Sequence, residues 1–84
     1  MEQRLLELKD ELTNILAKKE IIVDDVSFVK EGKYLFLRIT LDKVNGIDLD
    51  TIVEASNIIN PIVDEYDLIE ESYILDVISK ERGL

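Results

Sequence analysis

The chain has 84 residues and a net charge of −9, and it contains neither cysteine nor histidine. This length allows a single domain, expected over residues 1–84, and the missing residue types exclude disulfides, thiolate metal sites and histidine-based catalysis. A hydrophobic content of 46% is that of a globular chain, so the high charge does not indicate disorder.

The first half of the chain predicts one helix and two strands. Residues 2–19 form the helix, because their leucines and Ile15 recur at helical spacing on one stripe. Residues 22–29 are rich in β-branched side chains and predict a strand, interrupted by Asp24 and Asp25. Residues 30–33 then form a hairpin turn in which Gly32 is free to adopt a positive φ.

The clearest strand covers residues 34–41, where apolar side chains alternate between two faces. One face carries Leu35, Leu37, Ile39 and Leu41, and the other carries Tyr34, Phe36, Arg38 and Thr40. A turn at Asn45 and Gly46 follows, and Asp48 is placed to cap a second helix.

The second helix is expected to bury Leu49, Ile52, Ala55, Ile59 and Ile62 or Val63. Pro61 is expected to kink this helix rather than end it, since the apolar spacing continues beyond it. Residues 64–72 read as an acidic loop, and residues 73–79 as the last strand, with Tyr73, Leu75 and Val77 on one face.

These elements predict an α+β domain of two layers, in the order α-β-β-α-β. Two amphipathic helices need the same face of a three-stranded sheet to bury their stripes. The first two strands form an antiparallel hairpin, and the helical crossover before the third makes the sheet mixed. This order resembles the topology of RNA-binding modules of the KH type II class.

The sheet face turned away from the helices should be an open docking surface. It would carry Tyr34, Phe36, Ile74 and Ile78 around Arg38 and Asp76. Four apolar side chains on adjacent strands are expected to form a contiguous patch, which typically marks a binding site. The alternative is a set of scattered exposed hydrophobes, which are common on protein surfaces.

Charge is divided unevenly along the chain. Residues 44–79 contain nine acids and no lysine or arginine, whereas four bases, Lys30, Lys33, Arg38 and Lys43, lie within residues 30–43. An acidic half attracts basic partners and repels phosphate backbones. A plainly solvated surface is the alternative interpretation.

No residue pattern indicates an enzyme, a metal site or a cofactor. The carboxylate pairs lack the loop spacing and glycine of a calcium site, and the isolated glycines form no phosphate-binding loop. The Gly-X-X-Gly loop with which KH modules clamp RNA is also missing, so direct RNA recognition is the weaker alternative. The apolar runs are too short for a membrane span and the N-terminus is unlike a signal peptide, so we expect a cytoplasmic protein.

Several short motifs, in order and with matching spacing, resemble the N-terminal domain of the bacterial ribosome maturation factor RimP. The motifs are residues 28–33, 37–43, 45–47 and 73–77, together with Ser56 in the second helix. Two departures are Ile52, where the family has a cysteine, and the stretch after Ser79, which lacks the family's proline-glycine turn. The family's second domain, a small β-barrel, is absent from these 84 residues.

The resemblance implies a non-catalytic assembly factor that binds the maturing 30S ribosomal subunit, through a basic ribosomal protein and with a possible rRNA contact. The expected partner-binding residues are Lys33, Phe36, Arg38, Asp42, Ile74, Asp76 and Ile78. Gly32, Gly46, Ser56, Tyr73 and Ser79 are expected to support the fold. Two alternatives stay open: a homodimerisation or general interaction module that uses the open sheet face, and a KH-like RNA-binding domain.

Overall fold

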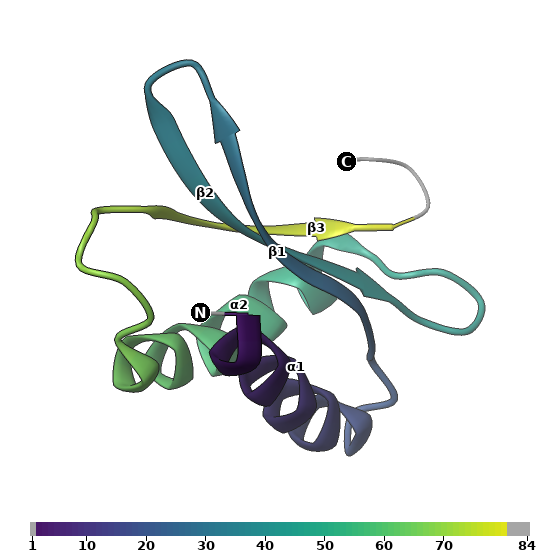
Figure 1. The fold of residues 1–84 in the computed structure, drawn as a ribbon. Helices are drawn as coiled ribbons and strands as arrows, with labels where there is room; N and C mark the ends of the chain where they lie inside the picture. Colours follow the sequence, from purple (N-terminus) through teal and green to yellow (C-terminus); the bar gives the residue numbers. More distant parts are fainter. Residues whose placement is uncertain (1, 81–84) are drawn as a thin grey trace.

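The computed structural model describes residues 2–80, and its elements follow the expected order. They are α1 (Glu2–Ala17), β1 (Ile22–Glu31), β2 (Tyr34–Asp42), α2 (Leu49–Tyr66) and β3 (Ile74–Ser79). Both helices lie on the same side of the sheet (Figure 1), so the domain has two layers. The predicted α+β fold class is confirmed.

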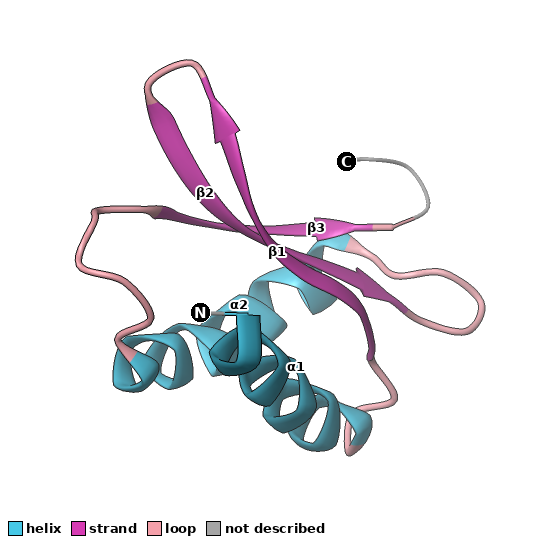
Figure 2. Cartoon of the chain, viewed as in Figure 1, coloured by secondary structure: helices cyan, strands magenta, loops and turns pink. Residues whose placement is uncertain are grey.

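The sheet has the strand order β1-β2-β3, with β2 in the centre. β1 and β2 pair antiparallel as a hairpin, whereas β2 and β3 pair parallel across the α2 crossover. The sheet is therefore mixed, as predicted. The tip of the hairpin projects away from the helices (Figure 2), so its turn at Gly32 and Lys33 stands clear of the helical layer.

The core lies between the helices and the sheet. Its fully buried side chains come from the apolar stripes of α1, β2 and α2: Leu8, Leu12, Leu16, Leu37, Ile39, Leu41, Ile59 and Val63. Burial of each such side chain stabilises the fold by about 1.5–3 kcal/mol compared with leaving it exposed to water. The alternation in β2 therefore determines which face of the sheet the helices cover.

The helix α1 ends two residues before the predicted boundary, in a left-handed cap. Glu20 has a φ of 64°, and the Ile21 amide donates to the Leu16 carbonyl over 3.1 Å. The Glu20 amide donates to Ala17 over 2.9 Å, which completes a Schellman motif. Ile21 is 2% exposed, so the cap turns the chain directly from the helix into the core.

The strand β1 is longer than predicted and contains a bulge. Its register shifts between Val23 and Asp25, which leaves Asp24 without a partner position on β2. The pairing then continues to Glu31, opposite Tyr34, so the turn is tighter than the four residues expected. Gly32 has the predicted positive φ, at 62°.

The helix α2 begins at the predicted cap and continues further than predicted. The Asp48 carboxylate accepts a hydrogen bond of 2.8 Å from the Thr51 amide, and the helix passes through Pro61 as expected. The prediction of a loop from residue 64 was wrong, because Tyr66 is held against α1. Its hydroxyl donates to Glu11 over 2.8 Å, and the Arg4 guanidinium donates to its carbonyl over 2.6 Å.

Two smaller predictions were also wrong. Leu49, expected in the core, is 76% exposed at the first residue of α2. Tyr73, expected to open the last strand, precedes β3, and its ring packs edge-on against Phe28 with 5.6 Å between ring centroids. This aromatic contact holds the chain at the entry to β3.

Candidate functional site

The open face of the sheet, defined here by Tyr34, Phe36, Arg38, Thr40, Ile74, Asp76 and Ile78, is built from two parallel strands. Phe36 lies opposite Ile74, Arg38 opposite Asp76, and Thr40 opposite Ile78. Leu37, Ile39 and Leu41 are fully buried beneath the helices, so their neighbours on β2 point the other way. Tyr34 is 57% and Ile74 46% exposed, so the open face presents apolar area to its surroundings.

An ion pair occupies the middle of the open face. The Nε atom of Arg38 donates to the Asp76 carboxylate over 2.8 Å, and a second guanidinium nitrogen lies 3.5 Å from a carboxylate oxygen of Glu31. The guanidinium carbon also lies 5.8 Å from the centre of the Phe36 ring. The hydrogen bond to Asp76, with smaller effects of both carboxylates, raises the pKa of Arg38, so this side chain remains a cation.

The strand β1 adds residues to the open face that the sequence did not reveal. Val29 lies opposite Phe36, Ser27 opposite Arg38 and Glu31 opposite Tyr34. Partners in an antiparallel pair share a face, so Val29 enlarges the apolar area and Glu31 becomes the second acid beside Arg38. The bulge hid these relationships, because it changes the parity of the strand between Val23 and Asp25.

Two of the expected binding residues lie at opposite ends of β2. Lys33 is exposed in the projecting hairpin turn. Asp42 is at the far end, where its carboxylate accepts a hydrogen bond of 2.8 Å from the Lys43 amide. The structure therefore brings together Phe36, Arg38, Ile74, Asp76 and Ile78, but not Lys33 and Asp42.

The residues expected to support the fold occupy turns and the helical side of the sheet. Gly46 has a φ of 93° in the turn before α2, and its amide donates to the Lys43 carbonyl over 2.9 Å. Ser56 is half-buried on α2, and Ser79 is 3% exposed at the end of β3. Among the described residues, the buried Ser79 hydroxyl has no hydrogen-bond partner.

A second ion pair joins the two edge strands. The Lys80 ammonium, directly after β3, lies 3.1 Å from the Asp24 carboxylate in the bulge of β1. The hydrogen bond that the ammonium donates to this carboxylate raises the pKa of Lys80. The pair thus spans the end of the sheet past β2, a relationship for which the sequence held no local signal.

The acidic segment, defined here as residues 64–71, covers the end of α2 and the loop after it. Its five acids are all exposed: Asp64, Glu65, Asp67, Glu70 and Glu71. The pKa of Tyr73 is raised, mainly by burial of its phenol and further by the charges of Asp64 and Asp67. The negative field of the segment therefore reaches the entry to β3.

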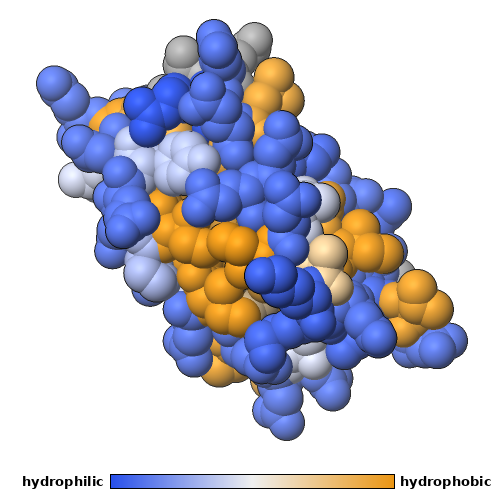
Figure 3. Space-filling model, turned by 90° about the horizontal axis from the view of Figure 1, so that it is seen from below, coloured by the Kyte–Doolittle hydropathy of each residue, from blue (hydrophilic) through white to orange (hydrophobic). Residues whose placement is uncertain are grey.

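The helical side also exposes apolar side chains, although in a different setting. Figure 3 shows hydrophobic residues in the middle of this face, with hydrophilic residues around them. Leu6 of α1 is 64% exposed and Val53 of α2 is 52% exposed. A pocket of about 280 Å³ beside α1 is lined by Leu5, Leu6, Lys9, Asp25 and Val26.

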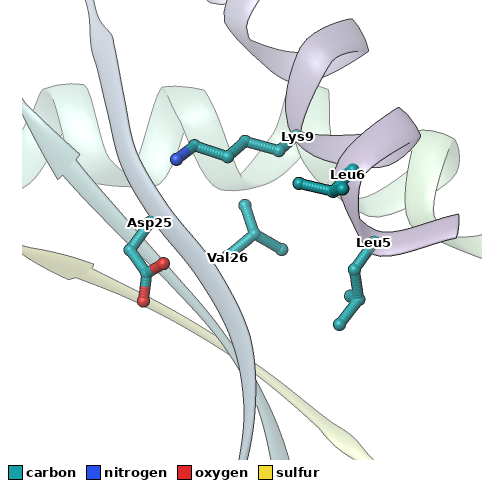
Figure 4. Close-up of a pocket in the computed structure, with 5 residues that line it drawn as sticks. All are labelled: Leu5, Leu6, Lys9, Asp25 and Val26. Carbon is teal, nitrogen blue, oxygen red and sulfur yellow. The ribbon is translucent and has the colours of Figure 1, made fainter. Parts of the chain in front are cut away.

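This pocket holds no catalytic arrangement. Leu5, Leu6 and Val26 approach the same space, whereas the Asp25 carboxylate turns away from them (Figure 4). Within residues 2–80, no three acidic side chains converge as a metal site would require. None of the helices over the same residues is long and apolar enough to cross a bilayer.

Comparison with known families decides the relationship of this chain to other proteins. The family model of the RimP N-terminal domain matches residues 11–80, from the middle of α1 to the end of the described structure. The chain belongs to the RimP N-terminal domain family. RimP is a ribosome maturation factor, so this chain is a domain of that kind and the predicted resemblance is confirmed.

Proposed function

We propose that this RimP domain acts without catalysis, by binding the maturing 30S subunit in the cytoplasm through a basic ribosomal protein. The observation that carries the proposal is the open face, where apolar side chains from three strands surround the half-buried pair of Arg38 and Asp76. An apolar patch with a charged centre has the composition of a protein interface, in which aromatic and arginine side chains supply most of the binding energy.

The charge of the domain supports a basic partner. The net charge is −9, and the five acids of the acidic segment are exposed on one stretch of chain. Opposite charges on two proteins accelerate their encounter and orient it, whereas a phosphate backbone is repelled. Contact with rRNA would then be confined to the projecting hairpin, which carries Lys30 and Lys33.

The chemistry of the side chains supports a binding role. The 84 residues include no histidine and no cysteine, and the glycines of the described chain lie singly in turns. The shortest ion pair of the described residues, between Arg38 and Asp76, lies on a sheet face rather than in a cleft. A positioned acid or base in a concave site is what general acid–base catalysis requires.

The experiment that tests the proposal is a pull-down of free 30S subunits with this chain. Arg38→Glu and Phe36→Asp should each weaken capture by about tenfold or more, as expected for residues at the centre of an interface. Matched controls make the same changes on the helical side: Lys9→Glu and Leu6→Asp should leave capture unchanged. Equal loss in the control variants, or retention in the two test variants, would refute the use of the open face.

A charge exchange separates recognition from folding. Arg38→Asp combined with Asp76→Arg preserves an ion pair on the same two strands, so the fold should be kept. If the partner recognises these charges, the exchanged variant will remain defective in capture while its Tm recovers. Full recovery of capture would mean that the pair serves the fold alone.

Self-association would use the same face, and sedimentation of the pure chain distinguishes the two proposals. A monomer at micromolar concentration supports the ribosomal proposal, since the face is then free for a partner. A tight dimer disrupted by Phe36→Asp would favour the dimerisation alternative.

A further inference from the structure

The outer edge of β3 offers unpaired backbone groups. The Lys80 amide donates to the Leu41 carbonyl of β2 over 2.8 Å, which fixes the side to which alternate residues of β3 point. Leu75, Val77 and Ser79 therefore direct their amides and carbonyls away from β2. No other strand of the described chain pairs with this edge, since β3 ends the strand order.

This edge lacks the usual protection against strand pairing. β3 contains no lysine, arginine, proline or bulge, features that disfavour the addition of a strand, and its one charged residue, Asp76, is paired with Arg38 on the open face. By contrast, β1 at the other edge carries the bulge at Asp24, closed by the ion pair with Lys80. The edge at β1 is therefore protected against the addition of a strand, whereas the edge at β3 is open to it.

A small pocket adjoins the open edge on the helical side. It has a volume of about 100 Å³ and is lined by Ile47, Asp48, Leu49, Ile52, Val77 and Ser79. Two of these, Val77 and Ser79, are residues whose backbone faces outward. Leu49 is 76% exposed at its rim, and Ser79 contributes the buried hydroxyl that has no partner among the described residues.

We propose that the edge of β3 accepts an extended basic segment of a partner protein as a fourth strand. Backbone pairing with Leu75, Val77 and Ser79 supplies the affinity, and one small aliphatic side chain enters the pocket beside Leu49. The proposal deepens the proposed function, and rests on it for the ribosomal identity of the partner.

Charge argues for this occupant and against a second copy of the chain. Residues 44–79, which contain β3 and the pocket, carry nine acids and no base. A lysine- or arginine-rich strand is attracted to such an edge, whereas a second copy would bring a net charge of −9 against another −9.

A peptide experiment tests the edge without using the ribosome. The probe is a fluorescein-labelled nonapeptide of alternating lysine and valine, compared with the same peptide N-methylated at adjacent central residues. N-methylation keeps the charge but removes backbone donors on both sides of the peptide, so affinity should fall about tenfold or more. Equal affinity of the two peptides would overturn the proposal, because charge alone would then explain binding.

Amide exchange in the full chain locates the contact. The amides of Leu75, Val77 and Ser79 should exchange rapidly in the free protein and slowly with the unmethylated peptide. Slowing confined to β1, or no slowing in β3 at saturating peptide, would refute the assignment.

A matched pair of variants tests the pocket. Leu49→Lys places a cation at its rim and should weaken the lysine-valine peptide by about tenfold, whereas Val53→Lys makes the same charge change one turn along α2 and should weaken it far less. Equal effects would reject a role for the pocket. If the unmodified chain does not capture 30S subunits but binds the peptide, the proposed function is refuted and the strand addition at β3 stands. If the chain captures 30S subunits but does not bind the peptide, only the strand addition at β3 is refuted.

Discussion

Arg38 on β2 and Asp76 on β3 lie 2.8 Å apart across a parallel strand pair, although 38 positions separate them in sequence. The pair therefore forms only after α2 has carried the chain back across the sheet. The pair lies in the middle of the open face, and its formation depends on the parallel register of β2 and β3.

Substitution on the two faces of β2 should separate packing from binding. Leu37→Ala removes a fully buried side chain and should lower the free energy of unfolding by about 2–4 kcal/mol. Phe36→Ala, one residue away on the open face, should cost less than half of that because its ring is partly exposed already. Urea denaturation of both variants measures the difference, and the reverse order would contradict the face assignment.

The ion pair itself should add little to stability. Arg38→Ala and Asp76→Ala should each lower the Tm by no more than about 5 °C, since both side chains keep roughly a quarter or more of their exposure. The double variant should lower it by less than the sum, because both changes remove one interaction. Additive losses in thermal melts would show that the two residues do not act together.

The cap of α2 should make stability depend on pH at the acidic end. The hydrogen bonds from Thr51 hold the pKa of Asp48 below its ordinary value of 3.8. A carboxyl with a lowered folded-state pKa stabilises the fold above its ordinary value and loses that effect as the pH falls through the folded-state value. Asp48→Asn should therefore lower the Tm at pH 7 by a few degrees at most.

The difference in Tm between Asp48→Asn and the unmodified chain should shrink as the pH falls below 3.8, because the stabilisation by the charged carboxylate is then progressively lost. Asp50→Asn serves as a matched control, because Asp50 lies in the first turn without accepting the capping bond. An unchanged difference between pH 7 and pH 3 would contradict the role of the Asp48 charge.

The buried hydroxyl of Ser79 should be dispensable for folding in the free domain. Ser79→Ala removes a polar atom that has no partner among the described residues, so the free energy of unfolding should stay the same or rise by up to about 1 kcal/mol. Urea denaturation checks this. A clear loss of stability would mean that the hydroxyl is satisfied in solution.

Neutralising the acidic segment should slow association with the small subunit. Changing its five acids to amides removes the long-range attraction, so the association rate should fall and depend less on salt. Stopped-flow binding at two ionic strengths measures both effects. Neutralising Asp10 and Glu20, exposed acids outside the segment, should have a smaller effect per charge removed.

The sequence predicted the fold wherever a local pattern decided the structure. Strict alternation in β2 identified both faces of the sheet, because every second side chain there is either under the helices or away from them. The helix cap at Asp48 and the hairpin turn at Gly32 were equally local, since each depends on one residue's own hydrogen bonds or backbone freedom.

The errors arose where distant contacts decided the outcome. The last turn of α2 is held by contacts of Tyr66 with Glu11 and Arg4, which no window of sequence around residue 66 contains. The bulge at Asp24 concealed which side chains of β1 share the open face. The pairing of Lys80 with Asp24 depends on the strand order, which local patterns leave undetermined.

The position of β3 also has a consequence for synthesis on the ribosome. β2 receives its parallel neighbour from residues 74–79, so a growing chain can form the hairpin and both helices before its sheet is complete. Until those residues emerge, the backbone groups of β2 that later bond to β3 are unpaired, and Arg38 lacks its ion-pair partner Asp76. Maturation of this factor's own surface is thus among the last steps in making the domain.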